Sequence, residues 1–122
     1  MTRPAVLLFN PSTWAGVGDL TAPWGLIYLA ERLKKDYRIF WIDQRLSPSW
    51  KTEVRELLQE RGLIAVGITA MTGIQLAGAI ECAELVKSCS DVPVVMGCVH
   101  ASILPLQTVA DPCIDFVVAG DG

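Results

Sequence analysis

Two segments of the chain place glycine beside side chains that could hold a ligand. Gly97–Ser102 (GCVHAS) follows the apolar run Pro93–Met96 and carries a thiol, an imidazole and a hydroxyl. Thr69–Gln75 (TAMTGIQ) adds two hydroxyls, an amide and a methionine. Glycine lets a bulky group approach the backbone, and a flexible methionine beside a buried strand favours a hydrophobic ligand surface. No carboxylate lies near His100 in the sequence, so these residue types predict ligand binding and not acid–base catalysis.

A third segment, Asn10–Pro23, is long for a connection between a strand and a helix. Its hydroxyls and glycines at Ser12, Thr13, Gly16 and Gly18 could cradle a phosphate, as flavodoxins do. The segment contains neither a G-x-G-x-x-G pattern nor a P-loop lysine. A phosphate loop and a plain surface loop therefore both stay open as interpretations.

Several of the polar residues also have a structural explanation. Thr72 and Gln75 have the spacing of a capping box, which would satisfy two amides at the start of a helix. A hydrogen-bonded structural role suits His100, the one histidine, better than metal ligation. Asp43 ends an apolar run, as ribose-binding acids do, but without the glycine fingerprint this signal is weak. Thr69 stands where a receiver domain would need its aspartate, which argues against Mg²⁺-dependent phosphoryl chemistry.

The four cysteines do not have the spacing of a metal site. They are separated by seven, nine and fifteen positions and form no C-x-x-C pair. Cys82 and Cys89 fall on one helical face, and we expect both to be small buried hydrophobic groups in a reducing cytoplasm.

The elements that position these segments follow from hydrophobic periodicity. Helical patterns lie between five apolar runs of strand length. The order β-α-β-α-β-α-β-α-β predicts a single α/β domain over residues 1–122, with a doubly wound parallel sheet. No helical pattern follows the last run, so we expect a domain without its final covering helix, trimmed from a longer protein. The expected strands are Ala5–Phe9, Tyr37–Ile42, Leu63–Thr69, Pro93–Met96 and Phe116–Ala119; the expected helices contain Leu26–Leu33, Trp50–Leu58, Leu76–Ala83 and Pro105–Val109, the second ending at Arg61-Gly62.

The composition argues against several partners. The net charge is −3, the isoelectric point is about 5.0 and no basic run occurs, which argues against nucleic acid and anionic membranes. The N-terminus has no signal-peptide pattern. Leu63–Ile80 carries no charge, but its glycines, threonines and change of period fit a strand, a loop and a helix better than a membrane span. We expect a cytoplasmic protein.

Together, the order and spacing of these motifs resemble a known family. They resemble the N-terminal cobalamin (vitamin B12)-binding domain of radical S-adenosylmethionine (SAM) enzymes, the group that includes the anaerobic Mg-protoporphyrin monomethyl ester cyclase. Two positions depart from the family: Gly97-Cys98 replaces a pair of glycines, and Gly120-Asp121-Gly122 stands where G-E-G-E is common. The resemblance rests on Asn10-Pro11, Pro23–Ala30 (PWGLIYLA), Asp43, Gly67–Thr72 with Gln75, Gly97–Ser102 with Pro105, and Asp115–Gly122.

The resemblance implies a flavodoxin-like five-stranded sheet in the order 2-1-3-4-5, with cobalamin over the carboxyl ends of its strands. Other cobalamin domains carry D-x-H-x-x-G after the first strand, whereas Asn10–Pro23 has no histidine. We therefore expect base-off binding without a protein histidine on cobalt, with the lower face empty, wet or covered by Trp14 or Met71. The cofactor-binding residues implied in this way are Asn10, Pro11, Trp14, Thr69, Met71, Thr72, Gln75, Gly97, Cys98, Val99, His100, Ser102 and Gly120.

The resemblance also implies a parent enzyme with a downstream radical SAM domain, a [4Fe–4S] cluster and S-adenosylmethionine. The chain itself would be non-catalytic, and its cobalamin would carry a methyl group or assist oxidative cyclisation. Two alternatives stay open: a flavodoxin-like FMN or nucleotide domain, and a ligand-free scaffold for protein contacts. An uncovered last strand would expose apolar surface and allow a homodimer of the fragment.

Overall fold

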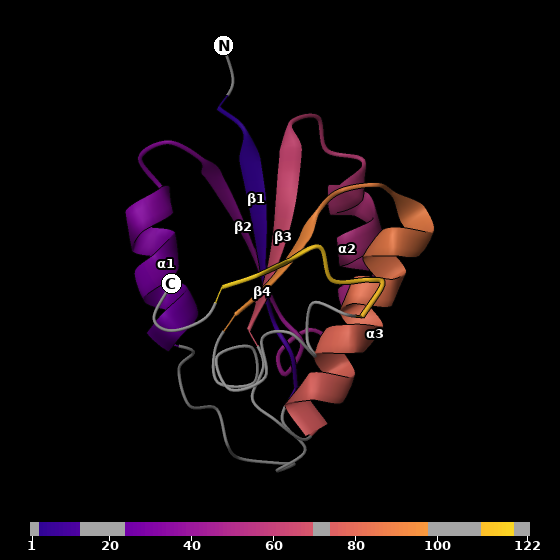
Figure 1. Ribbon diagram of the computed structural model, residues 1–122. Coiled ribbons are helices and arrows are strands. Elements are labelled where there is room, and N and C mark those ends of the chain that lie inside the picture. The colour runs from indigo at the N-terminus through magenta and orange to yellow at the C-terminus, as the bar shows by residue number, and fades with distance from the viewer. Residues whose placement is uncertain (1–2, 13–23, 70–73, 98–110, 119–122) are drawn as a thin grey trace.

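The strands form one parallel sheet. The computed structural model describes residues 3–12, 24–69, 74–97 and 111–118, which are the coloured parts of Figure 1. The five strands pair in the order β2-β1-β3-β4-β5, and every pair is parallel. This order confirms the expected flavodoxin-like sheet. The strands are β1 (Ala5–Asn10), β2 (Arg38–Asp43), β3 (Leu63–Thr69), β4 (Val94–Gly97) and β5 (Phe116–Val117).

Helices cover both faces of the sheet. Helix α1 (Trp24–Leu33) lies on one side, and α2 (Trp50–Leu58) and α3 (Ile74–Cys89) lie on the other (Figure 1). A central strand between two helical layers loses all contact with water, and every residue of β1 is buried. β1 is therefore apolar at nearly every position instead of alternating.

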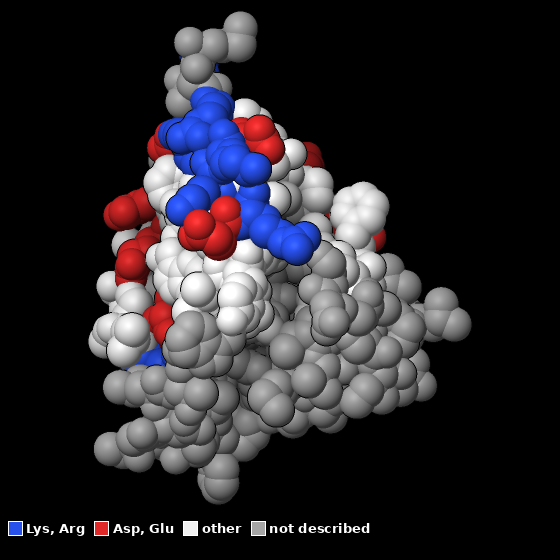
Figure 2. Space-filling view, turned by 90° about the vertical axis from the view of Figure 1, so that its left-hand side faces the viewer, with Lys and Arg blue, Asp and Glu red and all other residues white. Residues whose placement is uncertain are grey.

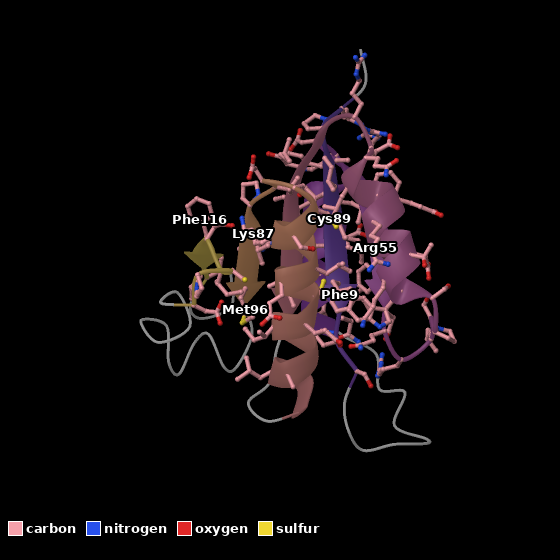
Figure 3. The ribbon with its side chains drawn as sticks, turned by 90° about the vertical axis from the view of Figure 1, so that its right-hand side faces the viewer. Phe9, Arg55, Lys87, Cys89, Met96 and Phe116 are labelled. Carbon is pink, nitrogen blue, oxygen red and sulfur yellow. The ribbon has the colours of Figure 1, made fainter. Side chains whose placement is uncertain are left out.

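The larger core lies between the sheet and helices α2 and α3. Phe9 of β1 meets Trp50 of α2, with ring centroids 5.2 Å apart and a tilted arrangement that aromatic pairs favour. Met96 of β4 is fully buried on the same side, as Figure 3 shows for both Phe9 and Met96. The other buried members of this core are Ala5, Leu7, Ile42, Val54, Leu63, Val66, Ile68, Ala79, Cys82, Ala83, Val86, Val94 and Ile114.

The opposite face is only partly covered. Val6 and Leu8 of β1 pack with Leu26 of α1. Paired residues of parallel strands point to the same face, so the register places Val95 and Phe116 on this side too. Phe116 is nevertheless 59 % exposed and projects from the edge of the sheet in Figure 3. The last strand thus presents apolar surface.

Several expected boundaries differ from the structure. β1 extends one residue further than expected, to Asn10, because the ladder with β2 continues through Asn10 and Asp43. β2 and β4 are each shifted by one residue, from Tyr37–Ile42 to Arg38–Asp43 and from Pro93–Met96 to Val94–Gly97. The expected end of the second helix at Arg61-Gly62 is wrong. Helix α2 ends at Leu58 with Gln59 as its C-cap, and Gly62, at φ 89°, instead makes the turn into β3.

The expectation for Cys89 is also wrong. Cys82 is fully buried, whereas Cys89 is exposed because it is the last residue of α3, where cover by the neighbouring elements ends. The uncharged segment 63–80 forms β3 and the start of α3, as expected. None of the helices in the described residues is long and apolar enough to cross a membrane. The expected helix at Pro105–Val109 lies outside the described residues.

Candidate functional site

The carboxyl ends of four strands lie side by side. Asn10 of β1 is paired with Asp43 of β2, and Thr69 of β3 is paired with Gly97 of β4. β1 and β3 are neighbours whose register runs through Phe9 and Ile68. The row of strand ends is therefore Asp43, Asn10, Thr69 and Gly97, at the lower edge of the sheet in Figure 1. In open α/β sheets this is the edge where ligands bind.

A buried ion pair occupies one end of this row. Asp43 is 7 % exposed, and its Oδ1 accepts hydrogen bonds from the Arg45 backbone amide (3.0 Å) and Arg45 Nε (3.0 Å). Asp43 Oδ2 accepts one from Arg45 Nη2 (2.7 Å) and one from Asn10 Nδ2 (3.2 Å). A carboxylate has about four acceptor positions, and here the protein itself fills four. The Arg45 side chain is only 11 % exposed and binds both carboxylate oxygens, one through Nε and the other through Nη2.

This environment keeps Asp43 ionised at neutral pH. Burial alone raises the pKa of Asp43, but the hydrogen bonds from Arg45 and Asn10 outweigh burial and lower the pKa below 3.8. The resulting charge is matched by Arg45, and every acceptor position is used. A ribose hydroxyl or Mg²⁺ would have to displace one of these bonds, so the geometry argues against Asp43 as a nucleotide ligand.

Gly97 marks the more open part of the edge. Among the described residues, a Cβ atom built on Gly97 would have one near neighbour, the backbone oxygen of Val118 at 3.9 Å, which is ordinary contact distance. Thr69 is beside it in the ladder and half-buried. Within the part of the chain that the structure describes, no residue makes a hydrogen bond to the Thr69 hydroxyl. The Thr69 hydroxyl and the Gly97 backbone thus lie side by side at the ends of β3 and β4.

The structure places only some of the site residues expected from the sequence. Asn10, Pro11, Thr69 and Gly97 all lie at the carboxyl edge, and the backbone of Gln75 lies in the first turn of α3. Asn10 is 3 % exposed and its amide is turned to Asp43. The remaining expected residues lie outside the described residues: Trp14, Met71, Thr72, Cys98, Val99, His100, Ser102 and Gly120, together with Thr13, Gly16 and Gly18 of the alternative phosphate loop.

Sequence reasoning missed three residues near this edge. Arg45 follows Asp43 by two positions, and Gln44 between them bonds the backbone of Ser12 through its side chain (2.8 Å). Gly78 lies inside α3 against Gln44. A glycine inside a helix costs about 1 kcal/mol relative to alanine, and that cost is the sequence signal for a close approach.

A group of basic side chains, including Arg3 and Arg38, lies at the other edge of the sheet. Figure 2 shows them gathered in its upper part, near the amino ends of the strands. Arg3 Nη1 donates to the backbone oxygens of Lys34 (2.7 Å) and Lys35 (2.8 Å), where α1 ends. Arg38 donates to the oxygens of Arg3 (2.9 Å) and Arg61 (2.9 Å). These guanidinium groups connect chain segments by hydrogen bonds to backbone oxygens, far from the carboxyl edge.

Comparisons with known proteins agree with this geometry. A family model for the B12 binding domain matches residues 14–122. The uncharacterized methyltransferase PH0819 of Pyrococcus horikoshii is 32 % identical over an alignment of 123 positions, which covers 96 % of this chain and 27 % of that protein. The structure of the radical SAM methyltransferase TsrM from Kitasatospora setae, with tryptophan substrate and the SAM analogue aza-SAM bound, matches with a TM-score of 0.69. That match has 26 % sequence identity and covers 87 % of this chain and 21 % of the TsrM chain.

The chain thus spans about a quarter of the length of the proteins that it matches. The family match extends over most of its residues and confirms the resemblance that the motifs indicated. The fold and the family match agree, and the chain belongs to the B12 binding domain family.

Proposed function

We propose that this chain holds cobalamin at the carboxyl edge of its sheet, as the binding module of a radical SAM enzyme that transfers a methyl group. The family match over residues 14–122 carries the first part of this proposal. The parent activity is supported by PH0819 and TsrM, both named as methyltransferases, the second as a radical SAM enzyme. Methyl transfer is therefore favoured over oxidative cyclisation. The [4Fe–4S] cluster and S-adenosylmethionine belong to the parent enzyme in this proposal.

The residues at the edge fit such a cofactor. Cobalamin has a broad ring and a nucleotide tail, so its site needs open backbone beside groups that form hydrogen bonds. Gly97 leaves space that a Cβ would fill, and the Thr69 hydroxyl next to it makes no hydrogen bond to a described residue. Thr69 and Gly97 are therefore the described residues that would line the groove, as the family resemblance implied.

The other end of the edge has a supporting role. The Asn10 amide and the Asp43 carboxylate bond one another and not an incoming ligand. Because Arg45 balances the charge of Asp43, this pair presents neither a free anion nor a free cation to the cofactor. Asn10 and Pro11 would thus shape the floor of the site through the backbone. When bound, cobalamin supplies a cobalt centre able to carry a methyl group, and the protein holds and orients it.

We further infer that cobalamin binds base-off without a protein histidine on cobalt. The support is in the sequence: the segment after β1 contains no histidine, and the whole chain has one.

Titration with hydroxocobalamin tests both statements. We expect saturable one-to-one binding in equilibrium dialysis, and no binding of FMN at the same concentrations. After reduction to cob(II)alamin, the EPR spectrum should lack nitrogen superhyperfine splitting, because neither an imidazole nor the cofactor's own base would ligate cobalt. Nitrogen splitting would contradict base-off binding without histidine, and preferential FMN binding would favour the flavodoxin-like alternative.

A variant at Gly97 locates the site. Gly97→Val fills the space over the backbone and should weaken hydroxocobalamin binding by about tenfold, the cost of an overpacked contact. Gly25→Ala on α1 is the control, since a Cβ there meets no atom of the described residues within 4 Å. Equal affinities of the two variants would place the cofactor elsewhere.

A further inference from the structure

The surface of α3 at Gly78 is filled by side chains from two other segments. A Cβ atom on Gly78 would lie 2.9 Å from Gln44 Oε1 and 3.2 Å from Pro11 Cβ. The first distance is shorter than real Cβ contacts, so a side chain at position 78 would force a shift. Pro11 is fully buried, which leaves it little room to yield. At Gly78, α3 therefore contacts Pro11, which follows β1, and Gln44, which follows β2.

Gln44 uses this space to hold the chain that leaves β1. Its side-chain Oε1 accepts the backbone N–H of Ser12 at 2.8 Å, and its own backbone N–H donates to Asn10 O at 2.9 Å. Gln44 thus accepts a hydrogen bond from Ser12 and donates one to Asn10. These two bonds extend the ladder of β1 and β2 beyond its last pair, Asn10 with Asp43. The backbone from Asn10 to Ser12 is thereby held beside Gln44.

Three segments of the carboxyl edge share this one contact. They are the segment after β1, the segment after β2, and helix α3, which begins just after the end of β3. The Asp43–Arg45 ion pair is the neighbouring anchor, because Asp43 directly precedes Gln44. A disturbance at position 78 would reach the candidate site through Gln44 and Ser12 without touching Gly97.

We propose that Gly78 and Gln44 are positioning residues of the cobalamin site: Gly78 provides the space that Gln44 needs to hold the Ser12 amide. This inference rests on the proposed function. The two residues would act on the cofactor through the placement of residues 10 to 12, and neither is expected to touch it.

Gly78→Ala is the first test. The alanine would expel Gln44 Oε1 from its place and break the bond to Ser12, although alanine itself is the better helix former. Without this bond, residues 10 to 12 must be ordered when the cofactor binds, at a cost of up to one hydrogen bond, which corresponds to about a fivefold decrease in affinity for hydroxocobalamin. The Ser12 amide should also exchange with deuterium faster, a readout by NMR that needs no cofactor. Gly25→Ala, with open space around the new Cβ, is the matched control.

A double-mutant cycle separates positioning from general damage. In a Gln44→Ala background no side-chain oxygen remains to be displaced, so Gly78→Ala should change the affinity by less than about twofold. If the wild type binds hydroxocobalamin and the two effects simply multiply, or if Gly78→Ala behaves like Gly25→Ala, the inference is wrong. If the wild type does not bind, the proposed function fails, and an unchanged Ser12 exchange rate in Gly78→Ala would independently refute the contact. Should Gly78→Ala not fold, Gln44→Ala alone must give the fivefold loss and the faster exchange.

Discussion

Replacing Asp43 by asparagine tests the ion pair at the end of β2. Asp43 accepts four hydrogen bonds, two on each oxygen. Asparagine retains one acceptor oxygen, so two bonds are lost and an NH₂ group is turned toward donors on Arg45 and Asn10. A hydrogen bond to a charged group contributes about 1.5–3 kcal/mol, and the side chain of Arg45 at 11 % exposure can recover only part of its hydration. The free energy of unfolding should fall by about 3 kcal/mol at neutral pH.

The pH dependence of the free energy of unfolding tests the same ion pair independently. Because the pKa of Asp43 is lowered in the folded protein, its ionised form stabilises the fold above the ordinary value of 3.8. That contribution is lost as the pH falls through the lowered pKa. The gap between wild type and Asp43→Asn should therefore be largest near neutral pH and should narrow at about pH 3.

Urea unfolding followed by tryptophan fluorescence measures the gap. Asp36→Asn is the matched control, since Asp36 is exposed and should change the free energy of unfolding by less than about 0.5 kcal/mol. A loss below about 1 kcal/mol for Asp43→Asn, or a loss equally large at about pH 3, would refute the ion pair as a source of stability.

The remaining predictions concern burial. Met96→Ala should lower the free energy of unfolding by about 2–5 kcal/mol, because Met96 is fully buried, whereas Val95→Ala on the half-buried opposite face should cost about 1 kcal/mol. Equal losses in urea unfolding would contradict this packing of β4. Iodoacetamide should modify exposed Cys89 quickly and Cys82 only after unfolding, because burial and the nearby charge of Glu81 raise the pKa of the Cys82 thiol. Peptide mass spectrometry reads both sites, and equal rates would show that Cys82 is not shielded.

Much of the fold follows from local patterns in the sequence. The apolar runs gave the five strands, since strands covered on both faces need apolar residues at most positions. The ends of β1 and β2 were harder to predict because they are polar. Asn10 and Asp43 stay in the ladder by bonding each other, a partnership across 33 positions that no periodicity contains. Cys89 failed for a related reason: helical spacing gives the face of a residue but not where its cover ends.

The edge of the site was predictable and its internal bonding was not. Parallel strands carry their ligands at their carboxyl ends, so Thr69 and Gly97 could be placed there from their order in the sequence. Nothing local showed that Asp43 is saturated by Arg45 or that Gln44 reaches Ser12. Such contacts depend on which segments meet in space. Gly78 was missed as well, although a glycine inside a helix is a local signal that another segment lies against it.

The unequal pairing of the strands means that the carboxyl edge of the sheet is firmly held at one end only. β1 is buried throughout and bonded on both sides, whereas β5 pairs through two residues and leaves Phe116 largely in water. Local unfolding of β5 exposes little new apolar surface, whereas local unfolding of β1 would disrupt both hydrophobic cores, since each contains β1 residues. Amide exchange should therefore slow steadily from β5 toward β1. A cofactor seated across this edge would contact firmly held backbone at Asn10 and, at Gly97, backbone beside the weakly paired β5, so its binding would stabilise β5 more than β1.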